Sequence, residues 1–164
     1  MARYIAGWSN VTAAAVADSS VHGAGNFPGV MRGGTSTMSW KVNEVYIGGE
    51  DTASTPTTMI LARTVTTVSS GAQTVGTYAA ADPNLTAPGT LVGWGNTMTV
   101  YPQRAPTLYL LNLSLNTFGG IARWQARYGE EIAAYGNVVG NGELVLSSKV
   151  GTGKTSGHII HELV

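Results

Sequence analysis

Hydrophobic and polar residues alternate most clearly between positions 109 and 128. Leucines occupy positions 111, 113 and 115, with the polar residues Asn112 and Ser114 between them. After a turn at residues 118–120 the alternation resumes, with Ala122 and Trp124 on one side and arginine or glutamine on the other. A period of two is that of a β-strand with one face on a core and the other toward water. The sequence predicts a β-hairpin here, with a third strand following.

Shorter alternating or β-branched segments follow the same rule elsewhere. We expect a strand or an extended arm at residues 2–17 and strands at 37–49, 57–68, 130–135, 143–148 and 158–164, with a short one possible at 97–101. Residues 57–68 are expected to pair with the strand before them. Within 37–49 the apolar positions change phase at Asn43-Glu44, which is typical of a β-bulge. Leu144 and Leu146 are expected to point inward.

These elements predict an all-β fold: a single antiparallel β-sandwich or jelly roll of roughly eight strands with long glycine-rich loops. We divide the chain into an extended arm and glycine-rich loop, residues 1–34, and a β-sandwich domain, residues 35–164. Glycines and prolines interrupt residues 69–103, which are interpreted as loops over one end of the sandwich. Trp94 lies there between two glycines, as a core anchor or a partner contact, and the core anchor is favoured.

Charge is scarce and balanced. Nine Lys and Arg balance nine Asp and Glu, and charged residues make up 11% of the chain, so nothing favours nucleic acid, a membrane surface or an acidic substrate. Two explanations stay open: a surface covered by hydroxyl groups, or a subunit whose surface neighbours bury. With no cysteine, disulfides and Cys-based zinc sites are excluded. The first residues do not resemble a signal peptide, so we expect folding in a reducing cytosol.

The residues indicate no reaction chemistry. Residues 151–155, Gly-Thr-Gly-Lys-Thr, lack the first glycine of a phosphate-binding loop, and a strand follows instead of a helix, so we expect a hairpin loop with an exposed lysine. His158 and His161 are three apart and would face opposite sides of a strand, so they cannot share a metal. His22 lies in a glycine loop without a ligand set. We expect no enzyme, no metal and no cofactor.

Acidic pairs and a basic row complete the candidates. Neighbouring carboxylates at 50–51 and 130–131 would point to opposite sides of a strand, which does not suit paired acid and base catalysis. Arg123 and Arg127 form a basic row that is either a solvated face, paired with Glu130 or Glu143, or a contact for an acidic partner. The candidates for a partner interface are Phe27, Met31, Arg32, Trp94, Tyr101, Arg123 and Arg127.

The C-terminal two thirds of the chain resemble a known class of viral protein. The resemblance rests on a leucine-rich strand followed by segments at 119–126, 129–132, 141–144 and 157–162, together with Met-Ile-Leu-Ala-Arg-Thr at 59–64. These segments are similar to small structural proteins of tailed bacteriophages, and the similarity covers about residues 57–164.

The resemblance implies a non-enzymatic β-sandwich or jelly roll that decorates or cements the phage head. Its partners would be the major capsid protein and copies of itself, as a trimer or dimer, without direct contact to nucleic acid or membrane. It would lie on the capsid exterior of the virion after synthesis in the host cytoplasm. Residues 1–34 and 69–103 would become ordered against neighbours on assembly.

Two other functions stay open. The chain could be a carbohydrate- or receptor-binding β-sandwich of a phage fibre or tail, with Trp94, Tyr101 and Tyr78 stacking on sugars. Aromatic residues exposed on one rim would favour sugar binding, and buried ones would favour cement. A self-assembling jelly-roll coat protein ranks lowest, because it needs a basic inner arm and the first 40 residues hold only Arg3 and Arg32.

Overall fold

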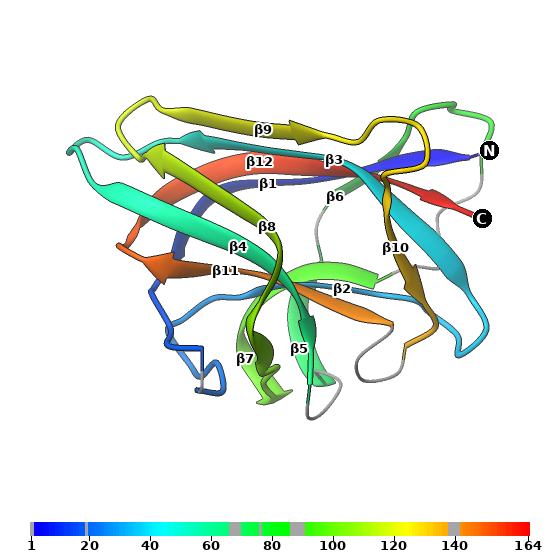
Figure 1. Cartoon of the computed structure of the whole chain (residues 1–164), viewed down its shortest axis with the longest axis horizontal. Coiled ribbons are helices and arrows are strands. Elements are labelled where there is room, and N and C mark those ends of the chain that lie inside the picture. The colour runs from blue at the N-terminus through cyan, green and yellow to red at the C-terminus, as the bar shows by residue number, and fades with distance from the viewer. Residues whose placement is uncertain (1, 19, 66–69, 76, 86–90, 138–141) are drawn as a thin grey trace.

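Two antiparallel β-sheets pack face to face to form the molecule (Figure 1). The computed structural model describes residues 2–18, 20–65, 70–75, 77–85, 91–137 and 142–164. Within them there is no helix, and the strands number twelve. The strands are β1 (Arg3–Ala13), β2 (Gly29–Arg32), β3 (Ser39–Gly49), β4 (Pro56–Thr64), β5 (Ser70–Val75), β6 (Thr77–Ala80), β7 (Leu91–Val100), β8 (Arg104–Asn116), β9 (Ile121–Gln125), β10 (Ile132–Tyr135), β11 (Glu143–Val150) and β12 (Gly153–Leu163). The predicted β-sandwich is confirmed.

The strand order is that of a jelly roll. One sheet has the order β10-β3-β12-β1-β6, with β9 also paired to β3, and the other has the order β5-β7-β2-β11-β4-β8. The consecutive pairs β1–β2, β3–β4, β8–β9 and β11–β12 each pass from one sheet to the other, and they stack in the same order in both sheets. Such a ribbon rolled into two sheets is a jelly roll. The strands β5, β6 and β7 extend both sheets beyond β1 and β2.

Three strands lie in the region that the sequence suggested was irregular. Residues 69–103 include β5, β6 and β7, with β6 paired to β1 and β7 paired to β2. The glycines and prolines of residues 69–103 are local signals for turns. Whether these residues form strands depends instead on the free edges of β1 and β2, which are distant in sequence. This difference explains why the strand count exceeds the predicted eight.

Two predicted pairings are wrong. β4 does not pair with its predecessor β3 but with β8 and β11, and β8 and β9 form no hairpin, because β8 pairs with β4 while β9 pairs with β3. The turn between β8 and β9 connects the two sheets: Thr117 N donates to Thr55 O at 3.0 Å, and Gly49 N donates to Gly120 O at 2.9 Å. A period of two is the same whether the partner strand lies alongside or in the facing sheet, so the pattern cannot separate these cases.

The expected boundary at residue 34 does not separate an arm from a sandwich. β1 lies between β12 and β6, and β2 lies between β11 and β7. Most of their apolar side chains are buried, with Tyr4 4% and Met31 1% exposed. The strand alternative for residues 2–17 is therefore confirmed, because alternate positions of this segment supply core.

The predicted bulge in β3 is confirmed at Asn43. On β12, Ile160 pairs with Glu44 and the next residue, His161, pairs with Val42, so Asn43 has no partner there. The extra residue keeps Trp40 and Val42 on the same side as Val45 and Ile47, and all four are buried between the sheets. Leu144 and Leu146 face this core as predicted.

Candidate interaction surface

Three of the seven predicted interface residues belong to the core. Met31 is 1% exposed and Trp94 is 4% exposed, and Phe27 packs against the same cluster. The Trp94 ring stacks on Phe27 with centroids 6.4 Å apart and contacts Trp8 at 5.0 Å. A Cβ on Gly29, opposite Trp94, would lie 2.9 Å from the indole, so this glycine makes room for the ring. Trp94 is the core anchor that the sequence favoured, and it offers no face to a partner.

The other four residues come from separate segments: Arg32 from β2, Tyr101 from the segment after β7, Arg123 from β9 and Arg127 from the loop after β9. Arg32 and Tyr101 are half-buried, whereas Arg123 and Arg127 are exposed. The basic row is interrupted, because β9 ends at Gln125 and Arg127 lies in the loop that leads to β10.

Arg123 pairs with Glu44, not with Glu130 or Glu143. The Arg123 guanidinium donates to Glu44 Oε2 at 2.8 Å, and His158 Nε2 lies 3.1 Å from Glu44 Oε1. The hydrogen bond from Arg123 holds the pKa of Glu44 below its usual value, against the opposing effect of burial. His158 also stacks on Tyr46 with ring centroids 5.2 Å apart.

The three histidines do not form a metal site. His161 points into the core, 0% exposed, beside Tyr4 and Trp40, so it faces away from His158 as predicted. His22 is buried elsewhere, and its Nδ1 donates to the carbonyl oxygen of Pro102 at 3.0 Å. Among the described residues, no cluster of three or more His, Cys, Asp or Glu could hold a metal ion. Lys154 is exposed near the start of β12, as predicted. The loop before it, where Gly151 has φ +76°, is not the predicted hairpin, because β11 and β12 lie in different sheets.

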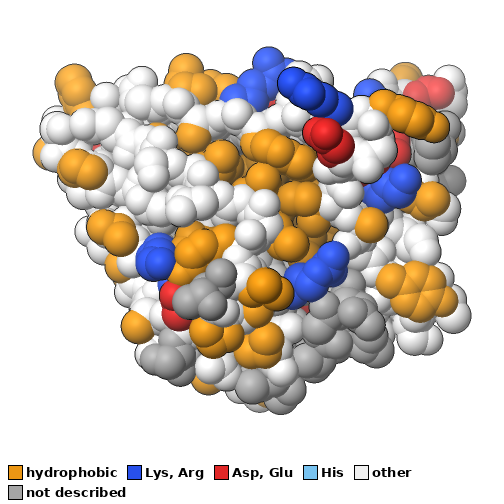
Figure 2. Space-filling view, in the orientation of Figure 1, with side chains coloured by type: hydrophobic (Ala, Val, Ile, Leu, Met, Phe, Trp, Pro, Cys, Tyr) orange, Lys and Arg blue, Asp and Glu red, His pale blue; other side chains and the backbone are white. Residues whose placement is uncertain are grey.

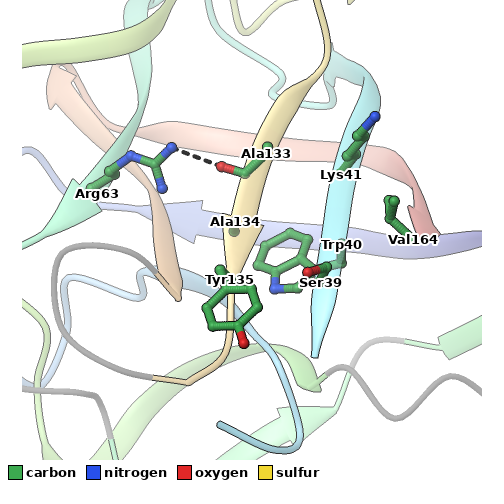
Figure 3. Close-up of a pocket in the computed structure, with 8 residues that line it drawn as sticks. All are labelled: Ser39, Trp40, Lys41, Arg63, Ala133, Ala134, Tyr135 and Val164. Carbon is green, nitrogen blue, oxygen red and sulfur yellow. Dashed lines mark hydrogen bonds between the residues drawn. The ribbon is translucent and has the colours of Figure 1, made fainter. Parts of the chain in front are cut away.

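A hollow of about 430 Å³ opens at one end of the sandwich (Figure 3). It is lined by residues 39–41 of β3, residues 133–135 of β10, Arg63 of β4 and Val164. Arg63 reaches across from the other sheet and donates to the carbonyl oxygen of Ala133 at 2.7 Å. Burial lowers the pKa of Arg63. The lining combines cationic and aromatic groups without Asp, Glu or His, so it offers contacts but no acid–base pair.

One edge of the sandwich is apolar and carries little charge. We call it the open edge: β8 in one sheet, and β9 with β10 in the other, which are the outermost strands on this side. No charged residue occurs at positions 105–122. Leu108 is 63% and Ile121 is 64% exposed, while Leu110, Leu113 and Trp124 are half-buried against the core. Figure 2 shows hydrophobic side chains gathered between β9 and β8 on this face.

Edge strands usually carry features that prevent pairing with another chain. Lysine, proline, a bulge or an inward charge are the common ones. β8 has Pro106 near its start and two irregularities in its pairing with β4, opposite Leu61/Ala62 and opposite Ala62/Thr64. Its residues from 107 to 116 include neither charge nor proline. The sequence prediction missed Leu108 and Ile121, although the uncharged run at 105–122 was a visible signal for them.

A buried polar network fixes the segment after β1 to the outer face of the β8 sheet. Arg104 is 0% exposed and donates to Asp18 at 3.1 Å, to Ser147 Oγ at 2.7 Å and to the carbonyl oxygen of Val16. The Tyr109 hydroxyl donates to the same carboxylate at 2.5 Å. This hydrogen bond is the main cause that lowers the pKa of Asp18. The network is structural, and no local pattern around Arg104 predicted it.

Comparisons with known proteins supply no relative: no family model, no curated protein and no solved structure matches this chain. Within the described residues, no helix is long and apolar enough to span a membrane.

Proposed function

We propose that this chain is a non-enzymatic structural protein of a tailed bacteriophage, a decoration or cement protein that binds the outer surface of the head and bridges capsomers. Its partners would be the major capsid protein and further copies of itself, as a trimer or dimer. The resemblance of residues 57–164 to such proteins motivates the proposal. The jelly roll agrees with it, and the open edge is the observation that carries it.

The open edge suits a repeated contact with a neighbouring subunit. Its half-buried leucines and exposed Leu108 and Ile121 offer apolar area, and its edge strands offer backbone donors and acceptors for strand addition. Interface cores are depleted in charge, as residues 105–122 are. A subunit that bridges two capsomers stabilises the closed shell because it binds only that state.

The alternatives receive less support. A fibre or tail module that stacks sugars on Trp94 would need an exposed ring, but Trp94 is 4% exposed and Tyr101 is half-buried. The side chain of Tyr78 lies outside the described side chains. For a self-assembling coat, Arg3 would have to belong to a mobile basic arm, whereas it begins β1 and lies 3.6 Å from Glu162.

Cryo-electron microscopy of the intact particle tests the location. We expect density for this jelly roll on the outer capsid, over the junctions between capsomers. Density at the tail or fibres, or a particle without this protein, would show that the cement proposal is wrong.

A double variant tests the open edge. Leu108→Asp with Ile121→Asp places charge on two exposed side chains, so the fold is retained while incorporation into particles is lost. Val21→Asp is the matched control, because Val21 is 54% exposed but lies between β1 and β2, away from the open edge. Normal incorporation of the double variant would exclude the open edge as the contact.

A further inference from the structure

Two irregularities of the sheet meet at Asn43. On one side of β3 the pairing with β12 skips this residue. On the other side the chain leaves β3 after β9 and returns as β10, and Figure 1 shows this loop. Ala126 N, at the start of the loop, donates to Asn43 O at 2.8 Å. A bulge next to a loop re-aims side chains, and here it opens a hollow of about 190 Å³.

The Asn43 side chain is a buried amide without a partner. Both Nδ2 and Oδ1 are inaccessible to solvent and make no hydrogen bond to any residue that the structure describes. A buried amide in this condition is costly, since it has lost water without gaining a replacement. Turned toward the hollow that Asn43 lines, the amide would be satisfied by a ligand that both donates and accepts hydrogen bonds.

The other polar groups of the hollow also offer both kinds of hydrogen bond. We call it the Asn43 hollow, and the groups that matter are Arg3, Asn43, Glu44, Gln125, Tyr128 and Glu131. Arg3 and Gln125 supply donors, and the two glutamates accept. The pKa values of both glutamates lie below their usual range, Glu44 through Arg123 and Glu131 through backbone amides, so both are acceptors at neutral pH. Because Arg123 already offsets the charge of Glu44, the groups suit a neutral polar ligand.

Tyr128 provides a flat apolar surface at the rim. Its side chain is 100% exposed. The loop that carries it is internally bonded: Glu130 N donates to Arg127 O at 2.9 Å, and Gly129 N donates to Glu131 Oε1 at 3.1 Å. Gly129 has φ +85°, a conformation that glycine adopts at little cost. The ring is therefore presented to solvent by a compact turn beside the hollow.

We propose that the Asn43 hollow binds a carbohydrate, with one saccharide unit hydrogen-bonded to Asn43 and the neighbouring polar groups while its C–H face packs on Tyr128. At about 190 Å³ the hollow holds the volume of roughly six waters and is smaller than a site for a drug-sized ligand. A single sugar ring fits this size, and the rest of a glycan lies outside. The inference does not depend on the proposed function.

Titration of the isotope-labelled full chain, followed by NMR, tests the site. The probes are glucose, galactose, mannose and N-acetylglucosamine at millimolar concentration, with tetramethylammonium as a cationic probe. We expect at least one sugar to shift amides of residues 43–44 and 125–131. Tyr128→Ala should weaken this binding about tenfold, since it removes the stacking ring. Tyr128→Phe, which keeps the ring, and Tyr135→Ala, which removes a tyrosine elsewhere, should leave it within about twofold.

A second variant separates binding from folding. Asn43→Ala removes the unpartnered amide, so it should weaken sugar binding while thermal stability is kept or increased. The proposal is overturned if no sugar shifts these amides, if only tetramethylammonium does, or if Tyr128→Ala binds like the unmodified chain.

Discussion

Two buried histidines should make the stability of this protein fall steeply with mild acidification. His22 is 1% and His161 is 0% exposed, and burial lowers the pKa of each to about 4 from its ordinary value of 6.5. For His22, the nearby Arg104 also lowers the pKa, while the hydrogen bond to Pro102 O opposes the shift. The folded state therefore holds both rings neutral at a pH where the unfolded chain would protonate them.

The sign and size of the effect follow from proton linkage. A pKa that is lower in the folded state gives stability that is complete above pH 6.5 and is lost as the pH falls toward 4. At pH 5 each histidine costs about 2 kcal/mol relative to pH 8, so the pair costs about 4 kcal/mol. This is a large part of the roughly 5–15 kcal/mol that stabilises a typical domain. The carboxylates of Asp18 and Glu44, whose pKa values are lowered from already acidic values, affect stability mainly at lower pH.

Urea unfolding at a series of pH values between 8 and 5 measures this dependence. We expect the free energy of unfolding to fall by about 2 kcal/mol per pH unit near pH 5. His22→Gln or His161→Gln should halve the slope, and the double variant should remove most of it, whatever the variants cost at pH 8. Leu61→Ala is the control, because this fully buried side chain carries no titratable group, so it should lower stability at every pH and keep the slope. A flat profile for the unmodified chain, or an unchanged slope in the double variant, would refute the reasoning.

Three further predictions concern stability and can be measured by urea unfolding at pH 8. Arg104→Met should cost about 1–3 kcal/mol, because it leaves the buried Ser147 hydroxyl and the carbonyl oxygen of Val16 without their donor, while Lys149 still pairs with the half-buried Asp18; no measurable cost would contradict the network. Gly151→Ala should cost several times more than Gly119→Ala: both have positive φ, but a Cβ on Gly151 would lie 2.2 Å from a backbone oxygen of β4, and one on Gly119 meets nothing within 4 Å. Leu61→Ala, fully buried, should cost about 2–5 kcal/mol, and Leu108→Ala, 63% exposed, less than about 0.5 kcal/mol; equal costs would place the core wrongly.

The sequence predicted the strands and their inward sides well where a period of two is long. The clearest case is β3, in which the phase change at Asn43 marked a bulge that the structure confirms. Side chains on a strand alternate for steric reasons that act within a few residues, so the pattern is legible from sequence. The partner of a strand depends on distant residues, so the sequence predicts a hairpin from β8 to β9 although the two strands lie in different sheets.

The interface candidates show the same limit for side chains. Conspicuous aromatic or sulfur-containing residues in glycine-rich sequence are candidates for either a partner or a core. Met31 and Trp94 are buried in the core. The strands that carry them, β2 and β7, are interior strands of one sheet, with a neighbouring strand on each side. The Asn43 hollow forms where the bulge on β3 meets the loop between β9 and β10. The local sequence pattern predicts the bulge, but no local pattern predicts that this loop lies beside it.

The low charge of the chain has two explanations, and the structure helps to separate them. A uniform hydroxyl-covered surface would scatter exposed apolar side chains evenly. Instead, five of the nine large hydrophobic side chains that are exposed in the described structure lie between residues 108 and 135, on the open edge and its connecting loops: Leu108, Phe118, Ile121, Tyr128 and Tyr135. β8 meanwhile keeps its exposed outer positions polar but uncharged, with Asn112 and Ser114. Three of these, Leu108, Phe118 and Ile121, lie in the uncharged run at 105–122. Apolar exposure where charge is absent favours a surface that a neighbouring subunit covers.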